Sequence, residues 1–128
     1  MEVAQKVKHY RELKIWQKGR LLVKAVHELT GEFPADERFG LVAQMRRAAV
    51  SVPSNIAEGQ ARHTTREFLL FLSHASGSLA ELDTQLVLSV DLTYCTASEV
   101  RTCSGYVEEI QRMIAAMRRS LLRVVASH

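Results

Sequence analysis

The sequence predicts an all-α protein, an antiparallel up-down bundle of four helices. Three observations support this: apolar residues recur at alternating spacings of three and four along four stretches, no stretch alternates with a period of two, and the 128 residues include only 6 Gly and 2 Pro. Short connectors make successive helices of similar length antiparallel neighbours. We expect the bundle over residues 13–125, after a basic N-terminal segment, 1–12.

The first helix is expected over residues 13–30, because one face repeats apolar or small residues at spacings of four and three. Thr30-Gly31 ends it, and the stretch 33–36, which contains Pro34, forms a connector. The face consists of Ile15, Gly19, Leu22, Val26 and Leu29.

The second helix is expected over residues 36–61, with Asp36 and Glu37 at the N-terminal end of its dipole. Pro53 lies inside this pattern. Its ring should crowd the carbonyl of Ala49 and remove one hydrogen bond, so we expect a kink near Pro53 rather than a break. The apolar stripe consists of Leu41, Met45, Ala48, Val52 and Ile56.

The third and fourth helices each begin with a capping box, in which a Thr side chain and a Glu side chain satisfy each other's free amides. These boxes are Thr64 with Glu67, and Thr96 with Glu99. The third helix should run to about residue 92. Its stripe is Phe68, Leu72, Ala75, Leu79, Leu82 and Leu86, and that of the fourth is Val100, Cys103, Val107, Ile110, Ile114, Met117, Leu121 and Val124.

Polar side chains form a second stripe on the second helix and another on the third. They contain no Lys, although an exposed face usually carries long charged side chains. We predict that the stripes meet in a partly buried network that fixes the register of helices or subunits, with Arg47 beside Glu58 or Glu81 and Asn55 beside Gln85. The alternative is an ordinary solvated surface. The predicted network is Arg47, Ser51, Asn55, Glu58, Glu81 and Gln85.

The start of the third helix is apolar all round, over residues 68–72. A single bundle buries one stripe per helix, so Leu70 or Phe71 would face water unless a loop or a second subunit covers it. Farther along, Gly77 would permit close approach of another helix. We therefore predict a homo-oligomer with Leu70, Phe71 and Gly77 among its contacts.

The residues indicate no enzyme, metal or cofactor. His74 has no acidic residue at a helical spacing that would orient it as a base. Cys95 and Cys103 have no second pair, so we expect free thiols that serve as small, partly buried apolar residues in a reducing compartment. Because no apolar signal core and no run near the ~20 residues of a membrane span occur, we expect a cytoplasmic protein.

The formal net charge of +3 is unevenly distributed. Residues 1–24 hold seven Lys or Arg against two Glu, which would favour attraction to a polyanion. The alternative is again a solvated face, but basic patches that are weak in one chain would act together in an oligomer. The candidate nucleic-acid-binding residues are Arg11, Lys14, Lys18, Arg112, Arg119 and Arg123.

The chain resembles the family of four-helix bundle proteins, also called 23S rRNA intervening-sequence proteins. The resemblance rests on a continuous block from Gln44 to Gly59 (QMRRAAVSVPSNIAEG), with Phe39-Gly40-Leu41 before it and the stretch 75–82 (ASGSLAEL) after it. It covers roughly residues 10–123. The positions carried over as a structural motif are Arg47, Ser51, Asn55, Glu58, Gly59, Gly77, Ser78, Glu81 and Gln85.

The resemblance implies a four-helix protomer that assembles as a homopentamer around a central channel. It also implies a relation to the accessory protein of diversity-generating retroelements, a basic pentamer that binds nucleic acid and a reverse transcriptase. We therefore expect a non-enzymatic adaptor that binds itself, structured RNA or DNA, and a protein partner such as a reverse transcriptase. The alternative is a structural scaffold that binds no nucleic acid.

Overall fold

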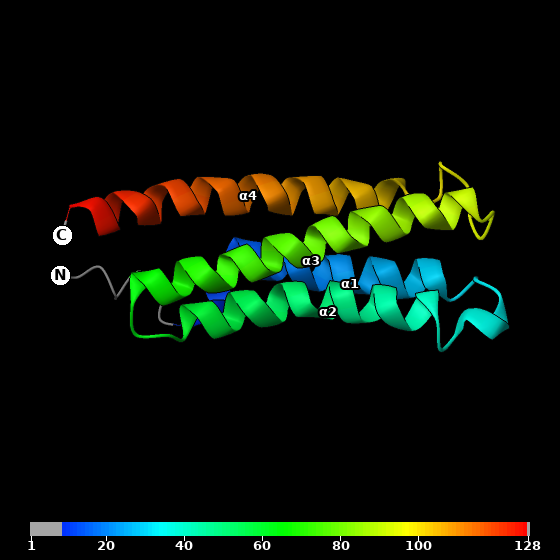
Figure 1. Ribbon diagram of the computed structural model, residues 1–128, viewed down its shortest axis with the longest axis horizontal. Coiled ribbons are helices and arrows are strands. Elements are labelled where there is room, and N and C mark those ends of the chain that lie inside the picture. Colours follow the sequence, from blue (N-terminus) through cyan, green and yellow to red (C-terminus); the bar gives the residue numbers. More distant parts are fainter. Residues whose placement is uncertain (1–8, 128) are drawn as a thin grey trace.

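The computed structural model describes residues 9–127 and shows a bundle of four helices (Figure 1). The described residues contain no strand, and the predicted all-α four-helix fold is confirmed. None of the described helices is long and apolar enough to cross a membrane. The elements are η2 (Tyr10–Glu12), α1 (Lys14–Thr30), η3 (Ala35–Glu37), α2 (Leu41–Gln60), α3 (Thr65–Asp91) and α4 (Arg101–Ala126).

Contacts between helices show how they are arranged. Gly19, early in α1, faces Pro53, late in α2, whereas Thr30 at the end of α1 accepts a hydrogen bond from Arg46, early in α2. Consequently α1 and α2 run in opposite directions. The start of α1, the α2–α3 connection and the end of α4 lie at one end of the bundle, here called the terminal end, and the other two connections lie at the opposite loop end (Figure 1).

The core is built from the predicted stripes, because each helix turns its apolar face inward. Burying one such aliphatic side chain stabilises the fold by roughly 1.5–3 kcal/mol. Val124 differs from expectation and is 46% exposed, since the last turns of α4 project past the start of α3 (Figure 1). The largest fully buried side chains include Ile15, Leu22, Met45, Ile56, Leu72, Leu79, Leu82, Leu86, Ile110 and Ile114.

Two helix starts differ from the sequence prediction. Residues 35–37 form the separate turn η3, so α2 begins at Leu41, and Glu37 acts as an external cap whose Oε1 accepts the Leu41 N–H at 3.1 Å. Thr96 and Glu99 exchange their two expected hydrogen bonds, but in a turn that precedes α4, which begins at Arg101. A reciprocal capping pair can therefore close a turn without the helix starting there.

Pro53 lies inside α2, and the helix continues through it. Its ring packs on Gly19 of α1, where a Cβ would lie 3.1 Å from the Pro53 Cβ. The missing side chain at Gly19 thus leaves room for the ring. The kink expected near Pro53 stays a prediction.

Candidate interaction surfaces

The two polar stripes meet at Ser51 and Ser78, on the boundary between α2 and α3. The hydroxyl oxygens of Ser51 and Ser78 lie 2.5 Å apart across the two helices. Asn55 donates to the carbonyl of Ser51, one turn earlier, at 2.7 Å. Because all three side chains are half-buried, this part of the boundary is a polar contact between helices rather than a solvated face.

Gln85 is the most buried member of the predicted network, at 5% exposure. Its Nε2 lies 3.4 Å from Oε2 of Glu81, and its Oε1 finds no donor among the described residues. A buried acceptor without a partner costs roughly 1–3 kcal/mol. The α2–α3 boundary therefore contains one side chain whose hydrogen bonding the described protomer leaves incomplete.

The specific pairs expected from the sequence do not form within the described chain. Arg47 and Glu58 are both exposed, and Glu58 pairs with Arg62 of its own helix at 2.7 Å. Asn55 bonds within α2 instead of reaching Gln85. An exposed i,i+4 ion pair such as Glu58–Arg62 contributes about 0–1 kcal/mol. A role for these residues between subunits stays a prediction.

The outer face of α3 carries an exposed row of small and apolar residues, here called the α3 seam. Its spacing of 3-4-3-4-3 is the repeat by which one helix packs along another, and none of its members is charged. A Cβ placed on Gly77 would meet nothing within 4 Å, and Leu70 and Val87 are 53% and 57% exposed. The α3 seam consists of Leu70, Ser73, Gly77, Ala80, Thr84 and Val87.

Phe71 is less exposed than the sequence suggested, because the protomer itself covers part of the ring. A Cβ on Gly59 would lie 2.7 Å from the Phe71 Cβ, and the guanidinium of Arg62 lies 4.7 Å from the ring centroid. Of Leu70 and Phe71, the two residues expected to face water, Leu70 is therefore the more exposed. Whether these positions contact another subunit stays a prediction.

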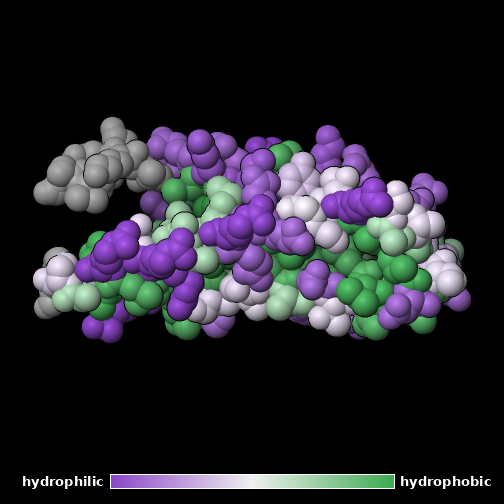
Figure 2. Space-filling view, turned by 90° about the horizontal axis from the view of Figure 1, so that it is seen from above, coloured by the Kyte–Doolittle hydropathy of each residue, from purple (hydrophilic) through white to green (hydrophobic). Residues whose placement is uncertain are grey.

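The candidate cations do not form a single patch. Lys18 is half-buried and pairs with Glu109 at 3.3 Å, and its ammonium lies 5.9 Å from the Tyr106 ring. Arg11 and Lys14 are exposed at the start of α1. Hydrophilic side chains also line the α4 face shown in Figure 2. The exposed cations of α4 named from the sequence are Arg112, Arg119 and Arg123.

The candidate cations named from the sequence did not include Arg62, in the α2–α3 connection, or Arg66, in the first turn of α3, although both lie at the same terminal end as Arg119 and Arg123 (Figure 1). Arg62 and Arg66 are distant in sequence from Arg119 and Arg123, and only the order of the helices brings the two pairs to one end of the bundle. Arg118 was also missed. It crosses to α3 and donates to the Ser73 hydroxyl at 2.7 Å.

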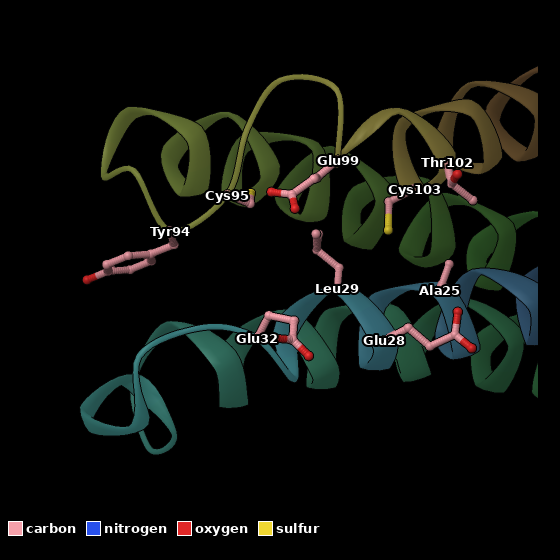
Figure 3. A pocket seen from close by; sticks show the side chains of 9 residues that line it. All are labelled: Ala25, Glu28, Leu29, Glu32, Tyr94, Cys95, Glu99, Thr102 and Cys103. Carbon is pink, nitrogen blue, oxygen red and sulfur yellow. The ribbon is translucent and has the colours of Figure 1, made fainter.

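The loop end carries a group of carboxylates. A pocket of about 490 Å³ lies there, between the end of α1 and the start of α4. Figure 3 shows the side chains that line it. Carboxylates of Glu28, Glu32 and Glu99 line it beside the thiols of Cys95 and Cys103. Within residues 9–127 no group of three His, Cys, Asp or Glu is arranged to hold a metal ion.

The two cysteines are free, with Cys103 buried and Cys95 half-buried. Burial raises the pKa of Cys103 to about 11 and also raises the pKa of Cys95. We predict that a thiol-specific reagent at pH 7.5 modifies Cys95 slowly and Cys103 only when the chain unfolds, because the thiolate is the reactive form. Counting modified thiols with and without guanidinium tests this; fast native labelling of Cys103 would contradict it.

Glu37 joins the two loops of the loop end. Tyr94 donates to its Oε2 at 2.7 Å, and the Leu41 N–H donates to its Oε1. These hydrogen bonds, that of Tyr94 first, lower the pKa of Glu37, and the same bond raises the pKa of Tyr94. A carboxyl whose pKa is lower in the folded state stabilises it above the unfolded pKa, and this contribution disappears as pH falls through the folded pKa.

We therefore predict that Tyr94→Phe lowers the melting temperature at pH 7 and reduces the part of the stability that is lost on acidification below the usual Glu pKa of 4.5. Melting temperatures of both chains between pH 3 and pH 7 would test this. Tyr106→Phe is the matched control, since the Tyr106 hydroxyl makes no hydrogen bond to another described residue. Parallel pH profiles for Tyr94→Phe and the unaltered chain would contradict the prediction.

A comparison with protein-family models matches residues 11–116 to the 23S rRNA-intervening sequence protein family. The comparison with curated proteins finds no match. The matched segment spans α1, α2, α3 and more than half of α4, and it includes both polar stripes and the α3 seam. Since the match covers most of the 128 residues, the chain belongs to the 23S rRNA-intervening sequence protein family.

Proposed function

We propose that the chain is a non-enzymatic homo-oligomeric adaptor, a homopentamer as the resemblance implies, which binds structured RNA or DNA through the basic terminal end. The observation that supports binding is the separation of charge along the bundle. Exposed Arg11, Lys14, Arg66, Arg119 and Arg123 belong to the terminal end, whereas the loop end carries the carboxylates of the pocket in Figure 3.

A polyanion approaching such a bundle is attracted to one end and repelled from the other. Neutralising each phosphate releases a counterion, so affinity falls steeply with added salt. One protomer offers few cations, but an assembly that presents the same end several times binds one nucleic acid at several points. Oligomerisation and binding therefore reinforce each other in this proposal. A reverse transcriptase is the protein partner that the resemblance suggests.

A gel-shift titration with a structured RNA at two salt concentrations tests the proposal. We predict that Arg119→Gln with Arg123→Gln weakens binding by more than tenfold at low salt and lowers the salt slope by roughly 0.7–0.9 for each lost phosphate contact. The matched control removes the same charge from the loop end, with Arg38→Gln and Arg101→Gln. No binding by the unaltered chain, or equal losses in both variants, would contradict the proposal.

The alternative function is a protein-interaction scaffold without nucleic acid. The α3 seam favours it, because an exposed, uncharged row at this spacing suits another helix whether or not a polyanion is present. The gel shift separates the two functions: the scaffold predicts no binding at either salt concentration.

The oligomer has its own test at Gly77. Alanine in an exposed helix interior is favoured over glycine by about 1 kcal/mol, so in an isolated protomer Gly77→Ala should only stabilise α3. If the α3 seam packs closely on another subunit, we predict that Gly77→Ala shifts the mass in solution toward the 14.4 kDa protomer. Gly105→Ala on α4 is the control, because a Cβ there also meets nothing within 4 Å. Identical masses for both variants would contradict the contact.

A further inference from the structure

A groove of about 420 Å³ follows the boundary between α1 and α2. Close packing of Gly19 on Pro53 draws the two helices together beneath it. The small side chains of Ser54 and Ala57 leave space above this contact, beside the large ring of Trp16. Tyr10 of η2 and Trp16 in the first turn of α1 line it, so one end of the groove lies at the basic terminal end of the bundle.

The face of the Trp16 ring in the groove already carries a planar cation. The Trp16 and Tyr10 rings meet edge to face, with centroids 5.3 Å apart. The guanidinium of Arg20 lies 5.4 Å from the centroid of the Trp16 ring. Trp16 is half-buried and thus held in place, while Arg20 is exposed and free to turn toward an incoming anion. A nucleobase can occupy the position over the indole that the guanidinium now occupies.

The charges beside the groove favour a polyanion over a neutral or basic partner. No described residue that lines it is acidic. Arg20 is one of its lining residues, and Arg11 lies next to Tyr10 in the sequence. Glu58, which follows the lining residue Ala57, is paired with Arg62 at 2.7 Å. Aromatic rings between cations are the combination by which proteins hold single strands, with bases stacked and phosphates paired.

We propose that the α1–α2 groove is a base-stacking site for single-stranded nucleic acid, in which a base lies on Trp16 and Arg20 turns to the adjoining phosphate. The inference rests on the proposed nucleic-acid function and deepens it, since it adds unpaired bases as the recognised feature. It places that recognition on α1 and α2 rather than on the exposed arginines of α4.

Trp16 is the only tryptophan, so its fluorescence reports on the groove alone. The probes are a uridine oligomer of about 12 nucleotides, a length in the range of known single-strand binding sites, and an abasic oligomer with the same number of phosphates. We expect the uridine oligomer to quench Trp16 and to bind roughly tenfold more tightly than the abasic one. Arg20→Gln should weaken uridine binding several-fold more than Lys24→Gln, which removes the same charge from an exposed position of the same helix.

Three results would overturn the inference. If both oligomers bind equally and Trp16 emission is unchanged, the cations bind phosphate elsewhere; the proposed function then stands without this site. If neither oligomer binds at low salt, the proposed function fails as well. If Trp16 emission shifts with protein concentration in the absence of nucleic acid, a second copy of the chain covers the groove.

Discussion

Replacing Gly59 with alanine is expected to destabilise the bundle by about 1–3 kcal/mol, the usual cost of overfilling a packed site. A Cβ there would lie 2.7 Å from the Phe71 Cβ and 2.9 Å from the Phe68 Cδ1. The Phe71 Cβ is fixed to the backbone, so rotating the ring cannot relieve the contact. The two helices would have to move apart where α2 ends and α3 begins.

Chemical denaturation of the variant measures this effect, with two glycines as references. Gly105→Ala should raise stability by about 1 kcal/mol, because the new methyl group meets open space and alanine favours the helix. The stability of Gly19→Ala should lie between those of Gly59→Ala and Gly105→Ala, since its Cβ would lie 3.1 Å from the Pro53 Cβ. If Gly59→Ala gained stability as Gly105→Ala does, the close approach of α2 and α3 described above would be wrong.

Gln85→Met is expected to change stability in the opposite direction, raising it by about 1–3 kcal/mol in the isolated protomer. The substitution keeps a long unbranched side chain and removes an acceptor that is buried without a donor among the described residues. The matched control is Gln111→Met. The Gln111 amide accepts from the Ser76 hydroxyl at 2.8 Å and donates to the Ser76 carbonyl at 3.1 Å, so the same substitution there should lower stability.

The Gln85 experiment also bears on assembly. Urea denaturation at low protein concentration reports on the protomer, and the same measurement at high concentration includes any subunit contact. A donor supplied after rearrangement in the oligomer would make Gln85→Met destabilising only at high concentration. A loss of stability at every concentration would instead mean that the Gln85 amide is satisfied within the chain.

The sequence alone was sufficient to predict the number of helices and most of their inward faces. Ile15, Leu22, Leu79 and Ile110 lie where the 3-4 spacing places them, fully buried. This works because the helix repeat fixes which side chains share a face, independently of what the face contacts. Helix starts were less accurate, since the capping chemistry of Thr96 and Glu99 also stabilises an isolated turn.

The candidate surfaces were only partly predictable. The polar stripes were recognised as unusual, and Ser51 does meet Ser78. Arg47 was expected beside Glu58 or Glu81, however, whereas Glu58 pairs with Arg62. Spacing alone does not distinguish an ion pair along one helix from a pair across two. The groove beside Trp16 was not predicted, because its walls come from two helices whose axial offset cannot be read from the sequence.

Thus the sequence by itself determined the four amphipathic helices, their order and the family motif from Gln44 to Gly59. The tertiary structure alone decided which side chains face each other, as when Arg118 reaches Ser73 and Tyr94 reaches Glu37. The reason is geometric. Periodicity defines the face of a helix, but rotation and axial offset between helices are set by how all four faces pack together, and each pairing depends on that common fit.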